Sequence, residues 1–207
     1  MSLTIIIVII TGLISYRCFQ DRALFEKLKH HPYSEVHNKE WYRMITSGFV
    51  HADWMHLGIN MFVLWQFGEI VEDEFTTYFG MTMGKVNYLL LYFLTIIFAD
   101  IPSLLKHKDN RHYSAIGASG AVSGILFVFI LFMPWHILKL YGIIPIPGIV
   151  AGIGYIVYST WADKKGGGNI AHDAHLYGAL FGFLFAIALK PSLFISFMEK
   201  LINGMPF

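Results

Sequence analysis

Charged residues and cysteines are scarce in this sequence of 207 residues. Only 14% of the residues are charged, whereas a soluble domain carries roughly a quarter. The single cysteine, Cys18, excludes an internal disulfide and a metal site built from several thiolates. The formal net charge of +1 leaves no excess that would indicate a nucleic-acid partner or an acidic partner.

Hydrophobic residues make up 56% of the chain and are gathered into runs, with the charged residues concentrated between them. This is the pattern of a polytopic membrane protein. At ~1.5 Å per residue each run approaches the ~30 Å thickness of the hydrocarbon layer, where backbone groups find no water and helices are expected. The six predicted spans cover residues 2–19, 55–71, 86–105, 115–133, 140–161 and 174–189.

The first apolar run and the loop after it need separate consideration, because each allows more than one structure. Residues 3–14 could form a signal peptide, but no basic residue precedes them and no small-residue cleavage site follows, so we expect a retained membrane helix. The segment 20–54 is long, polar and aromatic, and its Trp41, Tyr42 and Trp54 suit a small structure in the membrane interface. No internal repeat is evident, and the prediction is a single domain, 1–207.

Four polar side chains fall at one depth of the predicted spans. His56 and Asn60 lie at the start of the second span, Ser119 at the start of the fourth and His175 at the start of the sixth. These three spans begin on the same side of the membrane, and polar residues inside a membrane are candidates for function. The fourth and sixth spans also carry glycines at spacings that allow close helix packing, which predicts that they are neighbours. These glycines are Gly117, Gly120, Gly124, Gly178 and Gly182.

A serine beside a histidine is the pattern of a nucleophile with its base. Ser119 would attack a carbonyl carbon, and His175 would take its proton and later protonate the leaving amine. His56 and Asn60 are four residues apart, so they share a helix face, and both can donate hydrogen bonds to a developing oxyanion. The main-chain N–H of Ser119 is a third candidate donor. The residues therefore predict hydrolysis by acyl transfer inside the membrane.

Each residue also has a simpler interpretation when taken alone. Ser119 could be a packing residue, His175 a buried histidine bonded to a carbonyl, and His56 an interfacial histidine. Together with His51 and His172, the two histidines could also be metal ligands, but the spans carry no HExxH motif and no carboxylate at that depth. We therefore predict no metal, and the joint placement of the polar residues favours catalysis.

The motifs together resemble the rhomboid family of intramembrane serine proteases. Trp41-Tyr42-Arg43 resembles its Trp-Arg motif with one residue inserted, and His56 to Asn60 matches His-x-x-x-Asn. Gly117-Ala118-Ser119-Gly120 matches Gly-x-Ser-Gly, and Ala174 to Gly182 is similar to Ala-His-x-x-Gly-x-x-x-Gly. The resemblance covers about residues 41–182.

The resemblance implies an all-α bundle of six transmembrane helices with a long structured first loop, and a catalytic dyad of Ser119 and His175. It places His56, Asn60 and Gly117 in the oxyanion and substrate-binding set. It implies a membrane protein that cuts transmembrane segments of other proteins after a small residue, with no cofactor. We expect a multi-pass protein of a prokaryotic plasma membrane. One position departs from the family: Ser123 stands where many members carry a tyrosine that stacks on the catalytic histidine.

The sequence leaves open two other functions and the orientation of the chain in the membrane. A non-catalytic relative such as a derlin would bind membrane clients and would not need Ser119 or His175. A small transporter would have broken helices near the bilayer centre, for which Pro145 and Pro147 are the only hint. Eleven of the fifteen basic residues fall on the side that the resemblance places outside, against the positive-inside rule. We follow the resemblance and expect a cytoplasmic N-terminus.

Overall fold

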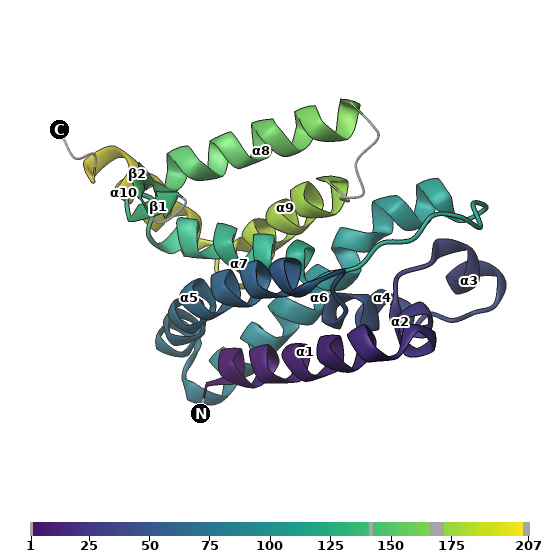
Figure 1. Cartoon of the computed structure of the whole chain (residues 1–207). Coiled ribbons are helices and arrows are strands. Elements are labelled where there is room, and N and C mark those ends of the chain that lie inside the picture. Colours follow the sequence, from purple (N-terminus) through teal and green to yellow (C-terminus); the bar gives the residue numbers. More distant parts are fainter. Residues whose placement is uncertain (1, 141–142, 166–171, 205–207) are drawn as a thin grey trace.

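The structure, a computed structural model, describes residues 2–140, 143–165 and 172–204. Long helices lie alongside one another, with the first loop at one end of the molecule and a small hairpin with the last helix at the other (Figure 1). The long helices are α1 (Leu3–Gln20), α5 (Trp54–Phe79), α6 (Met81–His107), α7 (Ser119–Phe132), α8 (Gly148–Lys165) and α9 (His172–Leu189). The protein is thus a mostly helical membrane protein, as the sequence predicts.

Helix α7 lies at the centre of this arrangement and packs against α5, α6 and α9. Every residue of α7 is buried except Ser119 and Leu126. A helix that is apolar on all sides is expected to be buried in this way. The predicted span 115–133 is wrong at its start, because residues 115–118 are not helical and Ser119 is the first residue of the helix.

Helix α1 is held against α5 by a buried carboxylate. Glu72 of α5 accepts hydrogen bonds from the main-chain N–H groups of Leu3 and Thr4, each at 3.0 Å, and from the hydroxyl of Thr4. The first N–H groups of a helix have no partner inside the helix, so this carboxylate satisfies them and complements the helix dipole. The first helix is therefore an integral part of the fold.

The first loop is structured, as the sequence predicts. It contains α2 (Arg22–Leu28), α3 (Pro32–His37), α4 (Arg43–Thr46) and a 3₁₀ turn, η1 (Ser47–Phe49). Arg43 of the Trp-Tyr-Arg motif donates to the carboxylate of Glu40 at 2.6 Å and to the main-chain oxygens of Glu26 and Lys29. This buried guanidinium therefore braces the loop internally.

The predicted fifth span, 140–161, is wrong at its start. Residues Ile137–Leu140 (β1) and Ile144–Pro147 (β2) pair as an antiparallel hairpin, and α8 begins only at Gly148. Pro145 and Pro147 lie in β2, where a missing N–H is tolerated at a sheet edge but would break a helix interior. The all-α prediction therefore needs this small hairpin added.

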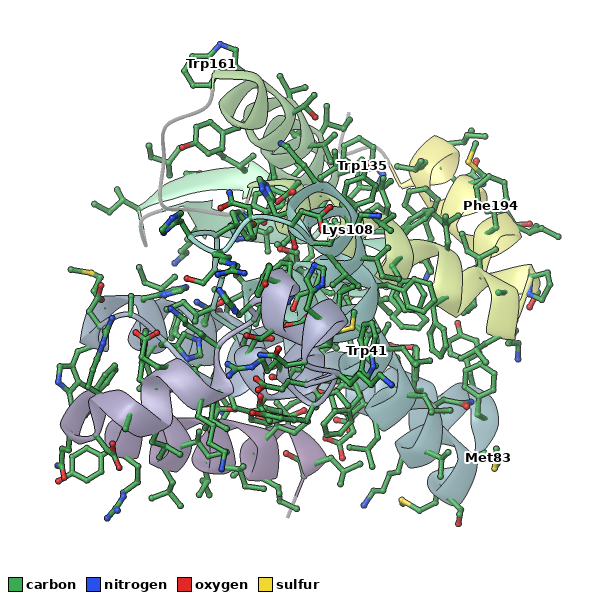
Figure 2. The ribbon with its side chains drawn as sticks, turned by 90° about the vertical axis from the view of Figure 1, so that its right-hand side faces the viewer. Trp41, Met83, Lys108, Trp135, Trp161 and Phe194 are labelled. Atoms are coloured by element: carbon green, nitrogen blue, oxygen red, sulfur yellow. The ribbon has the colours of Figure 1, made fainter. Side chains whose placement is uncertain are left out.

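Among the described helices, α1 and α6 are long and apolar enough to cross a membrane on their own. Helix α9 and the terminal α10 (Ser192–Asn203) pass the same test as a pair, bent by 113°. Helix α5 is long, but its second half carries four acidic residues, Glu69, Glu72, Asp73 and Glu74. The count of six spans stays a prediction. Exposed apolar side chains such as Trp161 on α8, Met83 on α6 and Phe194 on α10 point outward from the bundle (Figure 2).

Candidate active site

The N-termini of α5, α7 and α9 border a cavity of about 1170 Å³ at the end of the bundle covered by the first loop. The predicted residues Ser119, His175, His56, Asn60 and Gly117 all line this cavity. The structure thus brings together, from four segments, the residues that the sequence places at one depth.

Ser119 and His175 are in direct contact. The hydroxyl Oγ of Ser119 lies 2.7 Å from Nε2 of His175. This distance is possible because α7 and α9 pack backbone to backbone through glycines. A Cβ built on Gly178 would collide with the main-chain oxygen of Gly120, and one on Gly182 would lie 2.6 Å from Cα of Gly124. The predicted contact between these two helices is present.

Gly117 lines the cavity beside the ring of His56. Its φ of +116° is unfavourable for residues with a side chain, and a Cβ there would lie 2.8 Å from the ring of His56. Nδ1 of His56 accepts the main-chain N–H of Ala52 at 3.4 Å, which leaves the ring proton on Nε2. Nε2 is the ring nitrogen beside Gly117, so His56 presents a hydrogen-bond donor close to Ser119.

Asn60 is buried one turn after His56. Its Nδ2 donates one hydrogen bond to the main-chain oxygen of His56 at 2.9 Å. Because an amide nitrogen carries two hydrogens, one donor remains for a second acceptor in the cavity. The contact with His56 fixes the orientation of the amide on the shared helix face.

The aromatic support for His175 comes from α8. The ring of Tyr155 is stacked on the ring of His175, with centroids 6.1 Å apart and an interplanar angle of 26°. The hydroxyl of Ser123 donates to the main-chain oxygen of Ser119 at 2.7 Å, so it accepts from the hydroxyl of Tyr155 at 2.6 Å. Ser123, which stands where the resemblance leads one to expect a tyrosine, therefore helps to hold the ring of Tyr155 against His175.

Four hydrogen bonds to three residues hold the main chain of the segment that precedes Ser119. Ala115 pairs with His30 in both directions at 3.0 Å, and the N–H of Gly117 donates to the oxygen of Ser47 at 3.0 Å. The N–H of Ala118 donates to Nε2 of His51 at 3.3 Å. All three partners belong to the first loop and its exit, so this loop fixes where α7 begins.

His51 makes its contact as a neutral ring. The hydroxyl of Ser15 donates to the oxygen of Phe49 at 2.8 Å, so it accepts the Nδ1–H of His51 at 3.0 Å. Nε2 then carries the lone pair that receives the N–H of Ala118. Burial, with the nearby ring of His56 adding to it, lowers the pKa of His51 to about 3. The neutral tautomer therefore persists at physiological pH.

Within the described residues, no group of three or more histidine, cysteine, aspartate or glutamate side chains is placed to hold a metal ion. The side chain of His172, one of the four histidines in the metal interpretation, lies outside the described part of the chain. The rings of His51 and His56 contact each other edge to face, with centroids 4.9 Å apart. Each of these two rings accepts a main-chain N–H with one nitrogen, so its lone pair is already used.

The sequence missed several residues of this site. Tyr155 lies in a glycine-rich stretch without a motif. The departure at Ser123 leaves two possibilities open, that an aromatic ring comes from elsewhere or that none is present. In the sequence His51 has only the interpretation of a possible metal ligand, and no motif points to Ser47 or His30. Their roles depend on main-chain pairing between distant segments, which no local pattern encodes.

Comparisons with known proteins show which family the sequence resembles. The Rhomboid domain family matches residues 38–192. The chain is 31% identical over 154 residues to "Rhomboid-like protein 11, chloroplastic" of Arabidopsis thaliana and 30% identical over 149 residues to "Putative rhomboid protease YdcA" of Bacillus subtilis (strain 168). It is 28% identical over 172 residues to "Rhomboid protease GluP" of the same bacterium.

These matches cover most of this chain but less of the relatives. They include 69%, 72% and 80% of this chain, respectively. They include 50% of the Arabidopsis protein, 67% of YdcA and 29% of GluP. The family match, residues 38–192, includes His56, Asn60, Gly117, Ser119 and His175.

Proposed function

The chain belongs to the rhomboid family, and we propose that it is an intramembrane serine endopeptidase in which Ser119 and His175 form the catalytic dyad. The observation that carries this proposal is the 2.7 Å contact between Oγ of Ser119 and Nε2 of His175 inside the cavity. This distance is within the range expected for a nucleophile and its general base.

The proposed reaction begins with attack of Ser119 Oγ on the carbonyl carbon of the scissile peptide bond. As the new C–O bond forms, the hydroxyl proton moves to Nε2 of His175 and the carbonyl oxygen becomes an oxyanion. The imidazolium then gives this proton to the amide nitrogen, the C–N bond breaks, and the amine product departs. The carbonyl carbon remains bound to Oγ of Ser119 as an ester. Water attacks this ester with His175 as the base, which releases the acid and restores the serine hydroxyl.

The oxyanion would be stabilised by donors that are already in place. These are the Nε2–H of His56, the second amide hydrogen of Asn60, and the main-chain N–H groups at the start of α7, which have no partner inside the helix. Gly117 would serve this site by leaving room for the ring of His56. Fixed donors in a buried site stabilise charge without reorganising at the moment of reaction.

The cavity lining supports a membrane-anchored substrate. The lining includes apolar side chains of α5 and α7, among them Ile59, Val63 and Leu126. It also includes Lys106, near the end of α6, and His112, in the loop after it. This combination suits the end of a transmembrane segment, where an apolar stretch meets polar residues. We infer that such segments are the substrates, cut near the membrane surface after a small residue.

We also propose which membrane holds the protein and to which side its cavity opens. The family and the apolar helices make this an integral membrane protein, and we propose the plasma membrane of a prokaryote, with the cavity opening to the exterior.

The test is cleavage of a reporter with one transmembrane segment by purified protein reconstituted in liposomes. Wild-type protein is expected to release a fragment, and Ser119→Ala and His175→Ala are expected to release none while keeping the wild-type melting temperature. Intact reporter in every sample, with several unrelated transmembrane segments, would favour a non-catalytic client-binding role instead.

A further inference from the structure

A cluster of buried titratable side chains lies under the first loop, beside the segment that precedes Ser119. His30 follows α2, Glu35 belongs to α3, and Asp100 and Ser103 belong to α6. The side chains of His30 and Glu35 are fully buried, and Asp100 is almost so. None of these four residues contributes to the proposed reaction, so the cluster requires a separate explanation.

The hydrogen bonds of the cluster fit a protonated His30. The hydroxyl of Ser103 donates its hydrogen to the main-chain oxygen of Asp100 at 2.9 Å, so its oxygen accepts from Nε2–H of His30 at 2.8 Å. Nδ1 of His30 lies 2.7 Å from Oε1 of Glu35, which also accepts the main-chain N–H of His31. With the Ser103 hydrogen on the oxygen of Asp100, both ring nitrogens face acceptors, and this is the set of contacts that an imidazolium makes.

Charges on three helices surround this ring. Glu35 on α3 and Asp100 on α6, whose carboxylate lies 3.9 Å from Nδ1 of His30, favour the cation, as does the more distant Asp173 on α9. His107 on α6 opposes it. Burial alone lowers the pKa of His30, but the carboxylates of Asp100 and Glu35 together outweigh burial, so this pKa is raised.

Glu35 depends on the charge of His30 in turn. Its second oxygen, Oε2, is buried and has no hydrogen-bond partner among the described residues. A buried carboxylate that loses its partner is left with an uncompensated charge, which is strongly destabilising. Loss of the proton from His30 would therefore leave the buried carboxylate of Glu35 without the positive charge that compensates it.

The cluster is connected to the segment before Ser119 at two points. His30 itself pairs with Ala115 through both main-chain hydrogen bonds. Asp100 accepts the hydroxyl of Ser47 at 3.1 Å, and the main-chain oxygen of Ser47 accepts the N–H of Gly117. A change in the cluster would thus alter the main-chain hydrogen bonds of Ala115 and Gly117, which lie just before Ser119.

We propose that His30 is a positioning residue whose protonated ring holds residues 115–118, and with them the start of α7, in the reactive geometry. Activity is then lost when His30 loses its proton. This inference rests on the proposed protease function, but the hydrogen bonds that carry it do not involve Ser119 or His175.

The direction of the pH effect follows from the sign of the shift. The pKa of His30 is raised in the folded protein, so the charged cluster contributes stability below the pKa of an ordinary histidine and loses it as pH rises through the raised value. Activity is therefore expected to fall on the alkaline side. Because the loss concerns the placement of the oxyanion donors, kcat is expected to fall while KM stays nearly constant.

The experiment compares the pH dependence of kcat for wild-type protein, Glu35→Gln and Asp100→Asn in liposomes. Each substitution keeps the shape of the side chain and removes one negative charge near His30. The alkaline limb is expected to move to lower pH by about one unit or more, since an opposite charge at this distance changes a pKa by that amount. Asp100→Asn also serves as the second variant if Glu35→Gln does not accumulate as folded protein.

Asp109→Asn is the matched control. Asp109 follows α6 and pairs with His37 of α3 at 3.1 Å, so it forms a histidine–carboxylate pair between the same parts of the molecule, but at the surface. This variant is expected to keep the alkaline limb of the wild type. An unmoved limb in both Glu35→Gln and Asp100→Asn, or an equal shift in Asp109→Asn, would overturn the role of His30.

Hydrogen exchange separates this inference from the proposed function. Protection factors of the Ala115 and Gly117 amides are expected to fall above the same pH as kcat, and at lower pH in Glu35→Gln. If the wild-type protein cleaves no reporter at any pH, the protease proposal fails, and the protection factors still decide the role of His30. Protection that does not change with pH in any of the proteins would contradict it.

Discussion

The hydroxyl of Tyr155 lies 2.6 Å from the hydroxyl of Ser123, and through this contact α8 places an aromatic ring on the ring of His175. Ser123 is one turn after Ser119 and also donates to its main-chain oxygen. Two residues from different helices thus supply what one tyrosine supplies at this position in many members of the family. The position of the histidine is set by the packing of α8.

Substitution of Tyr155 separates the ring from its hydroxyl. Tyr155→Phe keeps the ring and loses one hydrogen bond of about 1 kcal/mol, so kcat is expected to fall by less than about tenfold. Tyr155→Ala also removes the ring and is expected to cost more. Reporter cleavage by each variant gives kcat directly. Tyr158→Ala, on an exposed position of the same helix, is the control. Wild-type kcat in Tyr155→Ala would show that the ring does not position His175.

Removal of the Asn60 amide tests the oxyanion donors. Asn60→Ala is expected to lower kcat on the order of 10²-fold, as for the loss of one oxyanion donor, with little change in KM. Steady-state kinetics on the reporter separate the two constants. A change confined to KM would place Asn60 in substrate binding, and unchanged kinetics would remove it from the site.

The contact between α7 and α9 is tested at Gly178. Gly178→Val inserts a side chain against the main-chain oxygen of Gly120, so it is expected to push the helices apart, lengthen the contact between Ser119 and His175, and lower both the melting temperature and kcat. Gly154→Ala is the matched control, because a Cβ there meets nothing within 4 Å. Its melting temperature is expected to stay the same or rise slightly. Full activity in Gly178→Val would contradict the close packing.

Acid is expected to weaken the protein through His51. Its pKa is lowered to about 3 in the folded protein, so between the ordinary histidine value of about 6.5 and pH 3 the unfolded chain binds the extra proton. Stability is then lost as pH falls through this window, by up to about 1.4 kcal/mol per pH unit. His51→Gln keeps an acceptor for the Ala118 N–H but cannot titrate. Melting temperatures at pH 7 and pH 5 should therefore differ less in His51→Gln than in the wild type. Equal losses would exclude His51 as the source.

Much of the cavity could be predicted because its residues lie near the starts of helices. The depth of His56, Asn60, Ser119 and His175 could be read from the apolar runs, and the glycines of α7 and α9 indicated which helices touch. The helix boundaries were harder to predict from the sequence. The prolines of β2 could have moved the start of α8 to Gly148, because they exclude a helix interior.

The start of α7 could not be read from the apolar run. Residues 115–118 are apolar enough to continue the helix, but their main-chain groups bond to His30, Ser47 and His51 of the first loop. Such pairing between distant segments overrides local preference, and it explains why Ser119 is the first helical residue and not one within the helix. The support of His175 by Tyr155 depends on tertiary packing in the same way.

Whether Ser119 is a nucleophile activated by His175 can be measured by reaction with a serine-directed fluorophosphonate in detergent. We expect stoichiometric labelling of wild-type protein, with the adduct on the peptide that contains Ser119, no labelling of Ser119→Ala, and strongly slowed labelling of His175→Ala. Labelling of Ser119→Ala at the wild-type rate, or no labelling of folded wild-type protein, would contradict this role of Ser119.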